Sequence, residues 1–272
     1  MTTPPLVDPM PEEGILVEAC VDSVESAVAA EAGGAARVEL CDNLYEGGTT
    51  PSAGMLAVVR ERIKIPVHVL IRPRGGDFLY NEDDCRVMLG DIALARELGA
   101  AGIVLGALFP DGSVDDRCTR MLIEAARPMS VTFHRAIDLV RDPFEALDTL
   151  MALGVDRVLT SGGAPTALEG AETLAALAWR AEGRMAIMAG GGITAANVAQ
   201  VVGDTGVREV HVRPTRRQES PMRHRRESVT MGKPYVPDEY ARLGTTAAAV
   251  AEIVAACVGG GAPPAGTADD AA

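Results

Sequence analysis

The chain has 272 residues, close to the roughly 250 of a single eight-stranded α/β barrel and long for two small domains. Hydrophobic residues make up 47% and aromatic residues only 3%, so we expect a large aliphatic core and no recognition of nucleic acid by base stacking. The 25 Lys and Arg residues against 38 Asp and Glu give a net charge of −13, which argues against nucleic acids and anionic membranes as partners.

The cysteines are scattered, odd in number and without a C-x-x-C motif, which is not the pattern of a disulfide framework. A reducing cytoplasm is therefore the expected location. Residues 1–13 lack the basic and apolar regions of a signal peptide and are expected to be flexible. Residues 258–272, rich in Gly, Pro and Ala, are predicted to be a disordered tail, which leaves 14–257 as one domain.

Short apolar segments alternate with helical ones along this domain, as expected when helices cover a parallel sheet. We predict strands at 15–20, from 37, and at 66–72, 102–105, 130–134, 157–160, 185–189 and 209–212. We predict helices at 22–33, 52–63, 82–98, 114–127, 143–153, 166–180, 194–202 and 238–257. A long irregular segment is expected between the last strand and the last helix.

A glycine recurs between a predicted helix end and the next strand, at Gly34, Gly99, Gly154 and Gly206. The spacings of 65, 55 and 52 residues match a β-α-β-α unit. Four such units give eight strands, whereas an open doubly wound sheet has no reason to repeat four times. We therefore predict an α/β fold, a single TIM (β/α)8 barrel with a C-terminal helix.

The same repeat indicates which side chains face the barrel interior. Glu209, His211 and Arg213 are in register with Glu39 and Cys41, and a charged side chain in a covered strand is costly unless it points at a site. Active sites of such barrels lie at the C-terminal ends of the strands. Those ends and the loops beyond supply the candidate site residues, which are Glu18, Cys20, Glu39, Cys41, Glu46, His68, Arg72, Arg74, Asp77, Thr132, His134, Asp138 and His211.

One interpretation is a barrel enzyme that acts on a small anionic substrate, for example a phosphorylated one. Glu18, Glu39 and His134 would supply the catalytic acid and base. Glycines that precede a helix start are a common phosphate site in barrels. The predicted substrate-binding residues are Arg72, Arg74, Asp77, Gly191 and Gly192.

A second interpretation is a metal-binding protein. Adjacent parallel strands lie about 4.8 Å apart, so the sulfurs of Cys20 and Cys41 are neighbours if the first two strands are level. Two thiolates suit a soft ion such as Cu(I). Zn(II) would need four ligands, with His134 and a carboxylate as candidates, and a hard divalent ion would use Glu18, Glu39 and a histidine. A third interpretation, a scaffold that only assembles with partners, gives no reason for charge inside a barrel.

Positive charge is concentrated late in the chain, where eight basic residues stand against three acidic ones between Arg208 and Lys233. This segment is either a solvated loop or a positive lip that attracts an anionic ligand.

Seven motifs closely resemble the CutC family of copper homeostasis proteins. They are CVDS (20–23), VELC (38–41), EGGTTPS (46–52), IRPRGGDF (71–78), VTFHRA (131–136), RVLTSG (157–162) and GGGI (190–193). The resemblance covers roughly residues 15–255. After His211 the chain has Arg213, Arg216 and Arg217, where the family usually has small residues.

The resemblance implies an eight-stranded barrel, a cytoplasmic location and assembly into a homodimer or homotetramer. It also implies a role in copper homeostasis, with Cu(I) bound by the residues that match Cys20 and Cys41. The expected partner is thus a copper ion, or a small anionic ligand if the protein is an enzyme.

Overall fold

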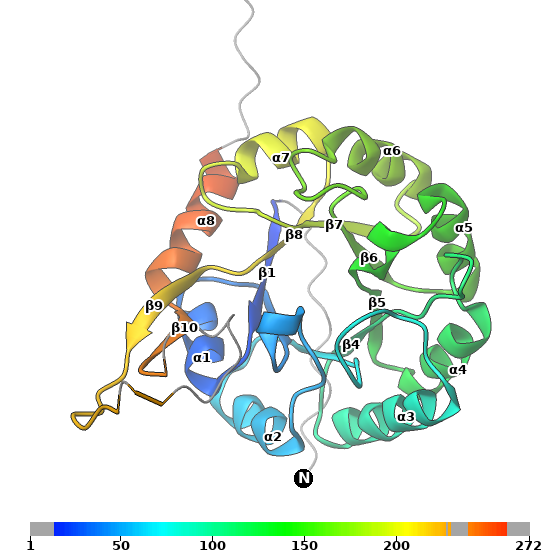
Figure 1. The fold of residues 1–272 in the computed structure, drawn as a ribbon. Helices are drawn as coiled ribbons and strands as arrows, with labels where there is room; N and C mark the ends of the chain where they lie inside the picture. Colours follow the sequence, from blue (N-terminus) through cyan, green and yellow to red (C-terminus); the bar gives the residue numbers. More distant parts are fainter. Residues whose placement is uncertain (1–13, 227, 230–238, 260–272) are drawn as a thin grey trace, which may run out of the picture.

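The computed structural model describes residues 14–226, 228–229 and 239–259. Eight parallel strands form a closed barrel in which each strand pairs with the next and β8 pairs with β1 (Figure 1). The strands are β1 (Leu16–Val21), β2 (Arg37–Leu40), β3 (Val67–Leu70), β4 (Gly102–Leu105), β5 (Ser130–Phe133), β6 (Arg157–Thr160), β7 (Ala186–Gly190) and β8 (Glu209–Val212). The predicted barrel is confirmed.

Helices surround the barrel (Figure 1). Short polar side chains cap several of their N-termini. They are α1 (Val24–Ala32), α2 (Ala53–Arg62), α3 (Glu82–Glu97), α4 (Asp116–Ala126), α5 (Pro143–Leu153), α6 (Ala171–Ala181), α7 (Val198–Thr205) and α8 (Ala247–Gly259). Asp142 caps α5, and Ser23 caps α1. Helix α6 begins later than predicted, because the backbone N–H of Ala167 donates to Gly191 O and ties the preceding loop to the barrel mouth.

The prediction of one helix over 238–257 is wrong at its start. Residues Ala241–Thr245 form β10, which pairs antiparallel with β9 (Thr215–Glu219) in a ribbon beside the barrel (Figure 1). Gly244 leaves room for the Gln218 side chain, since a Cβ there would lie 2.6 Å from Gln218 Nε2. The strand ends where Thr245 N–H donates to Ser26 Oγ, and α8 starts only after it.

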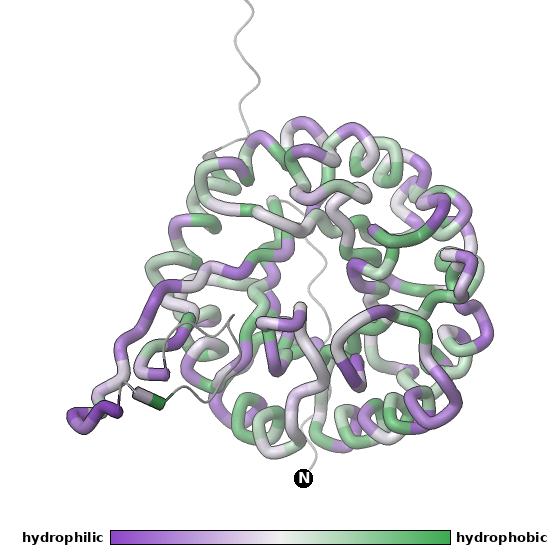
Figure 2. The backbone as a smooth tube through the Cα atoms, in the orientation of Figure 1, coloured by the Kyte–Doolittle hydropathy of each residue, from purple (hydrophilic) through white to green (hydrophobic). Residues whose placement is uncertain are grey.

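The ribbon is hydrophilic along β9, in contrast to the largely apolar barrel strands (Figure 2). Within the described ranges, no helix has both the length and the hydrophobicity to cross a membrane. Helix α8 continues to Gly259, past the predicted start of the tail at 258. The predicted flexible residues 1–13 and the remainder of the predicted tail lie outside the described residues.

All four repeated glycines adopt a left-handed backbone between a helix and the next strand, with φ of 89°, 79°, 77° and 70°. The third residue after each glycine opens an even-numbered strand and faces the barrel axis; these residues are Arg37, Gly102, Arg157 and Glu209. A Cβ on Gly102 would lie 2.6 Å from Nε2 of His68, so this glycine makes room for an imidazole from the neighbouring strand.

The interior positions therefore form layers of four from alternate strands. The first and lowest layer, from the even-numbered strands, is Arg37, Gly102, Arg157 and Glu209. The second layer, from the odd-numbered strands, is Glu18, His68, Thr132 and Met188. The third layer, from the even-numbered strands, is Glu39, Val104, Leu159 and His211. The outward-facing alternate residues pack against the helices in the main hydrophobic core. The charged side chains of these strands therefore gather at the axis, beside Met188, Val104 and Leu159.

Candidate functional site

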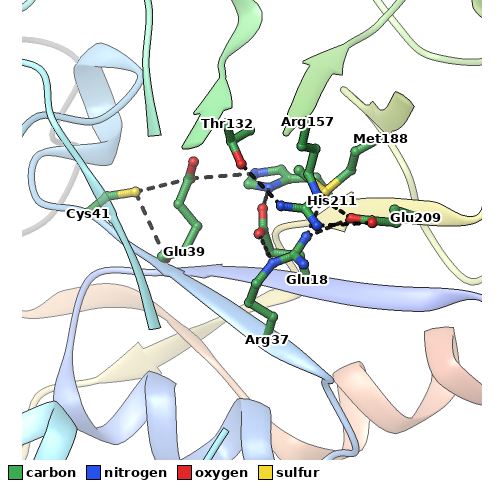
Figure 3. Close-up of polar contacts among 9 residues, drawn as sticks. All are labelled: Glu18, Arg37, Glu39, Cys41, Thr132, Arg157, Met188, Glu209 and His211. Carbon is green, nitrogen blue, oxygen red and sulfur yellow. Dashed lines mark hydrogen bonds and ion pairs between the residues drawn. The ribbon is translucent and has the colours of Figure 1, made fainter. Parts of the chain in front are cut away.

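Four charged side chains form a continuous chain of ion pairs at the bottom of the barrel (Figure 3). Fully buried Arg37 donates from Nε to Glu18 at 2.5 Å and from Nη2 to Glu209 at 2.8 Å. Arg157 donates to both oxygens of Glu209, with Nη2 to Oε1 at 3.1 Å. Two cations thus balance two anions, which burial requires.

Glu209 faces the interior as predicted but lies in the lowest layer, not near the top of the barrel. Arg37 and Arg157 were not among the predicted interior residues. The signal was available, because both occupy the Glu209 position of the glycine repeat.

His211 lies directly above this network. Its Nδ1 is 2.8 Å from Glu18 Oε1, and its Nε2 is 3.8 Å from Glu39 Oε2 (Figure 3). Burial alone would lower the pKa of His211, but Glu39, Cys20 and Glu18 together raise it well above its usual value. For the carboxyl group of Glu18 burial acts in the opposite direction and would raise the pKa, but Arg37 and His211 hold this pKa well below the usual range. A histidine held by a carboxylate in this way is oriented as metal-binding histidines are.

Two thiols lie beside this histidine. Cys20 Sγ is 3.6 Å from Cys41 Sγ, and Cys41 Sγ is 3.2 Å from Glu39 Oε2. The two strands are not level, since Cys20 pairs with Glu39 and not with Cys41. The two sulfurs are nevertheless neighbours. The hydrogen bond with Cys41 lowers the pKa of Cys20 well below the thiol value, and the same contact raises the pKa of Cys41. The contact therefore favours ionisation of Cys20 over ionisation of Cys41.

Burial raises the pKa of Glu39 to about 8, with Cys20 and Glu18 adding to the effect and His211 opposing it. Cys20, Glu39 and His211 each offer a donor atom, and these atoms lie within 4.8 Å of one another. With Cys41 they make a sulfur, imidazole and carboxylate set. Such a set suits soft and borderline metal ions.

This donor set lies at the floor of a cavity of about 480 Å³ that opens at the C-terminal ends of the strands. Cys20, Glu39 and His211 form the floor, and Arg72 and His134 belong to the wall. The floor residues come from β1, β2 and β8, which are neighbours in the barrel but far apart in the chain.

Of the predicted anion-binding residues Arg72, Arg74 and Asp77, only Arg72 lines the cavity. Arg72 is buried and lines the cavity, but its guanidinium donates to the carbonyls of Glu46, Gly48 and Gly76, so it holds two loops together. Arg74 pairs with Asp77 and Asp84. Neither Arg74 nor Asp77 is among the residues that line this cavity.

The predicted phosphate-binding glycines also lie outside the cavity lining. Gly191 and Gly192 have φ of 101° and 69°, and their carbonyls accept from Ala167 N and Asn197 Nδ2. Both glycines are therefore used in joining loops.

The basic segment after β8 contributes one residue to the cavity wall, Arg213. Arg216 pairs with Glu252, and Arg217 pairs with Glu219, both on the exposed ribbon. Lys233 lies outside the described residues. Most of the described segment is thus a solvated, ion-paired surface.

The fold and the site define a class, an eight-stranded (β/α)8 barrel with a buried thiol, imidazole and carboxylate group at the floor of its mouth. Within that class the chain belongs to the CutC family, whose model matches residues 15–215.

Relatives named copper homeostasis protein cutC homolog, from Mus musculus and Homo sapiens, are each 51% identical over 227 residues. The match spans 84% of this chain and 84% and 83% of theirs. The crystal structure of the CutC protein from Streptococcus agalactiae is 37% identical with a TM-score of 0.69, over 72% of this chain and 97% of that one. Thiamine phosphate pyrophosphorylase from Pyrococcus furiosus, 18% identical with a TM-score of 0.55, shares the fold.

Proposed function

We propose that the protein binds Cu(I) inside its barrel, with Cys20 and Cys41 as the principal ligands. The observation that carries this proposal is the pair of buried sulfurs 3.6 Å apart, of which Cys20 lines the floor of an open cavity and Cys41 lies behind it. Thiolates prefer soft ions, and the family's curated relatives carry copper homeostasis in their names.

The separation of the sulfurs bears on the number of ligands. A metal–thiolate bond is about 2.3 Å long, so two sulfurs on opposite sides of one ion would lie about 4.6 Å apart. Sulfurs 3.6 Å apart fit one ion only in a bent arrangement, which leaves a side open to a further ligand. We infer that His211 supplies it, since Glu18 already holds Nδ1 and leaves Nε2 facing the thiols and Glu39.

Titration of the reduced protein with Cu(I) against a chelator that changes colour tests the proposal. We expect about one equivalent to bind with high affinity, because one cluster of soft donors is available in the barrel. A protein that leaves all Cu(I) on a weak chelator would contradict it.

The affinity for Cu(I) is expected to rise with pH. The raised pKa values keep Cys41 a thiol and His211 protonated at neutral pH, and a donor atom must lose its proton before it binds a metal. Each proton released contributes about tenfold in affinity per pH unit below the pKa of that group. Chelator competition at pH 6, 7 and 8, corrected for the chelator's own protonation, measures this slope. A flat profile would show that neither group is a ligand.

We also infer from the family resemblance that the chain forms a homodimer or homotetramer in a reducing cytoplasm. Reducing conditions support the site, because neighbouring thiols lose their metal-binding form when they oxidise to a disulfide. Analytical ultracentrifugation of the reduced protein tests the assembly, and a single monomeric species would contradict it.

A further inference from the structure

The metal-binding proposal leaves His134 without a role. This residue follows β5, and its ring lies 4.7 Å from the ring of Phe78. A Cβ on Gly106 would lie 2.4 Å from Cε1 of His134, so the absence of a side chain at position 106 creates the space for the imidazole. Only 6% of the residue is exposed, and it lines the cavity.

The backbone fixes which nitrogen of the ring carries the proton. Ala136 N–H donates to Nδ1 of His134 at 3.2 Å, so Nδ1 is an acceptor and bears no hydrogen. Burial, with the nearby charge of Arg72, lowers the pKa of His134 to about 3, so the ring is neutral. The single ring hydrogen is then on Nε2, which makes Nε2–H a donor.

This donor is unsatisfied. Among the described residues, no hydrogen-bond acceptor lies within reach of Nε2 of His134, although the atom is buried. A buried donor without a partner costs about 1–3 kcal/mol, and native proteins rarely leave one. The acceptor is therefore expected to come from whatever fills the cavity.

The surroundings indicate the chemistry of that acceptor. The guanidinium of Arg72 lies over the Phe78 ring at 5.1 Å while donating to loop carbonyls, and Arg135 and Arg213 also line the cavity. The lining carboxylates are Glu39, Glu46 and Asp138, of which Asp138 pairs with Arg135. Leu70 and Leu159 supply apolar wall. A volume of about 480 Å³ is far larger than an ion and falls in the range of small-molecule sites.

We propose that the cavity binds a small organic carboxylate, one oxygen of which accepts the hydrogen bond from Nε2–H of His134. This inference goes beyond the copper site and holds for the metal-free protein. The carboxylate has two possible sources, a free metabolite or a thiol-bearing acid that brings Cu(I) to Cys20 in the same cavity.

NMR of the full-length, reduced and metal-free protein with ¹⁵N-labelled histidine tests the proposal. The probes are propionate, 3-mercaptopropionate and, as an uncharged control, propan-1-ol. We expect the two acids, and not the alcohol, to shift the His134 Nε2–H signal saturably, while the exposed His224 stays unchanged. Equal, non-saturating shifts with all three probes, or none, would overturn the proposal and indicate that water alone meets the donor.

Two variants separate the donor from the ring. His134→Asn keeps an acceptor for Ala136 N–H but lacks the outer donor, and a hydrogen bond to a charged group makes a loss of about tenfold or more in carboxylate affinity the expected result. His134→Gln places an amide donor near the Nε2 position and is expected to bind within a few-fold of wild type. Equal affinity of His134→Asn and wild type would overturn the proposal.

A measurement on the wild type alone covers the case in which the variants fail to fold. Nuclear Overhauser contacts between the propionate methyl group and Hε1 of His134 are expected, and contacts only to surface residues would contradict the site. A second arm adds one equivalent of Cu(I). Tighter binding of 3-mercaptopropionate, lost in Cys20→Ala, identifies a copper-carrying thiol as the source, whereas equal binding of both acids identifies a free carboxylate. Loss of the copper site leaves propionate binding to the metal-free protein intact, so the two proposals fail separately.

Discussion

Replacement of both Cys20 and Cys41 by alanine is expected to abolish high-affinity Cu(I) binding in the barrel. The two sulfurs are the softest donors of the candidate site and lie 3.6 Å apart. Loss of an outer group that only orients a ligand typically costs 10- to 100-fold in metal affinity, so loss of both thiolates should exceed about 100-fold. Chelator competition measures the change, and circular dichroism checks that the variant is folded.

A second pair of sulfurs provides a matched control for this experiment. Cys85 on α3 and Cys118 on α4 lie 3.0 Å apart outside the barrel interior. The variant Cys85→Ala with Cys118→Ala is expected to keep the barrel site, and it is the background in which the other pair should be removed. Retention of one tight equivalent after the loss of Cys20 and Cys41 in that background would refute the proposed copper site.

The substitution Arg37→Met is expected to cost about 3–5 kcal/mol in the free energy of unfolding. Removal of one partner from a buried ion pair leaves the other charges without compensation, and here both Glu18 and Glu209 depend on Arg37. Methionine keeps much of the side-chain volume, so the loss reports mainly on charge. Urea denaturation of the reduced, metal-free protein measures it.

An exposed ion pair supplies the comparison. Arg180 pairs with Asp148 on the surface, with side chains 43% and 49% exposed, and Arg180→Met should cost at most about 1 kcal/mol. If charge is the cause, combining Arg37→Met with Glu18→Gln should recover part of the stability, because one cation and one anion are then removed together while Glu209 keeps its pair with Arg157. Equal costs for Arg37→Met and Arg180→Met would show that the interior charges are not energetically coupled.

Much of the fold could be predicted from the sequence, because the glycine repeat records a geometric requirement. Gly34 and its three equivalents must adopt a left-handed conformation before a strand, and that need appears directly as residue type. The ribbon of β9 and β10 could not be predicted in this way. Its two strands are polar and short, and their pairing depends on contact between distant segments such as Gln218 and Gly244.

The candidate site was predictable in its residues more than in its contacts. Cys20, Cys41 and Glu39 followed from the rule that barrel sites lie at strand ends. The positions of Arg74 and Asp77 did not, because an arginine in a glycine-rich loop has equal chemical reason to bind a ligand or a neighbouring carboxylate. His211 was one histidine among several until the register set its Nδ1 against Glu18.

The buried charges beneath the cavity bear on how many protons a metal ion displaces when it binds. A run of contacts with alternating charge connects Arg157, Glu209 and Arg37 in the lowest layer with Glu18, His211 and Cys20 above them, and with Cys20 ionised these six charges sum to zero. In a medium of low permittivity, an added positive charge is tolerated when an equal charge leaves. Charge balance by itself releases one proton for a monovalent ion, whereas ligation of Cu(I) by both Cys41 and His211 releases two protons and leaves the site one unit more negative. Counting the protons released into a weakly buffered solution therefore reports how many of these two groups bind the metal.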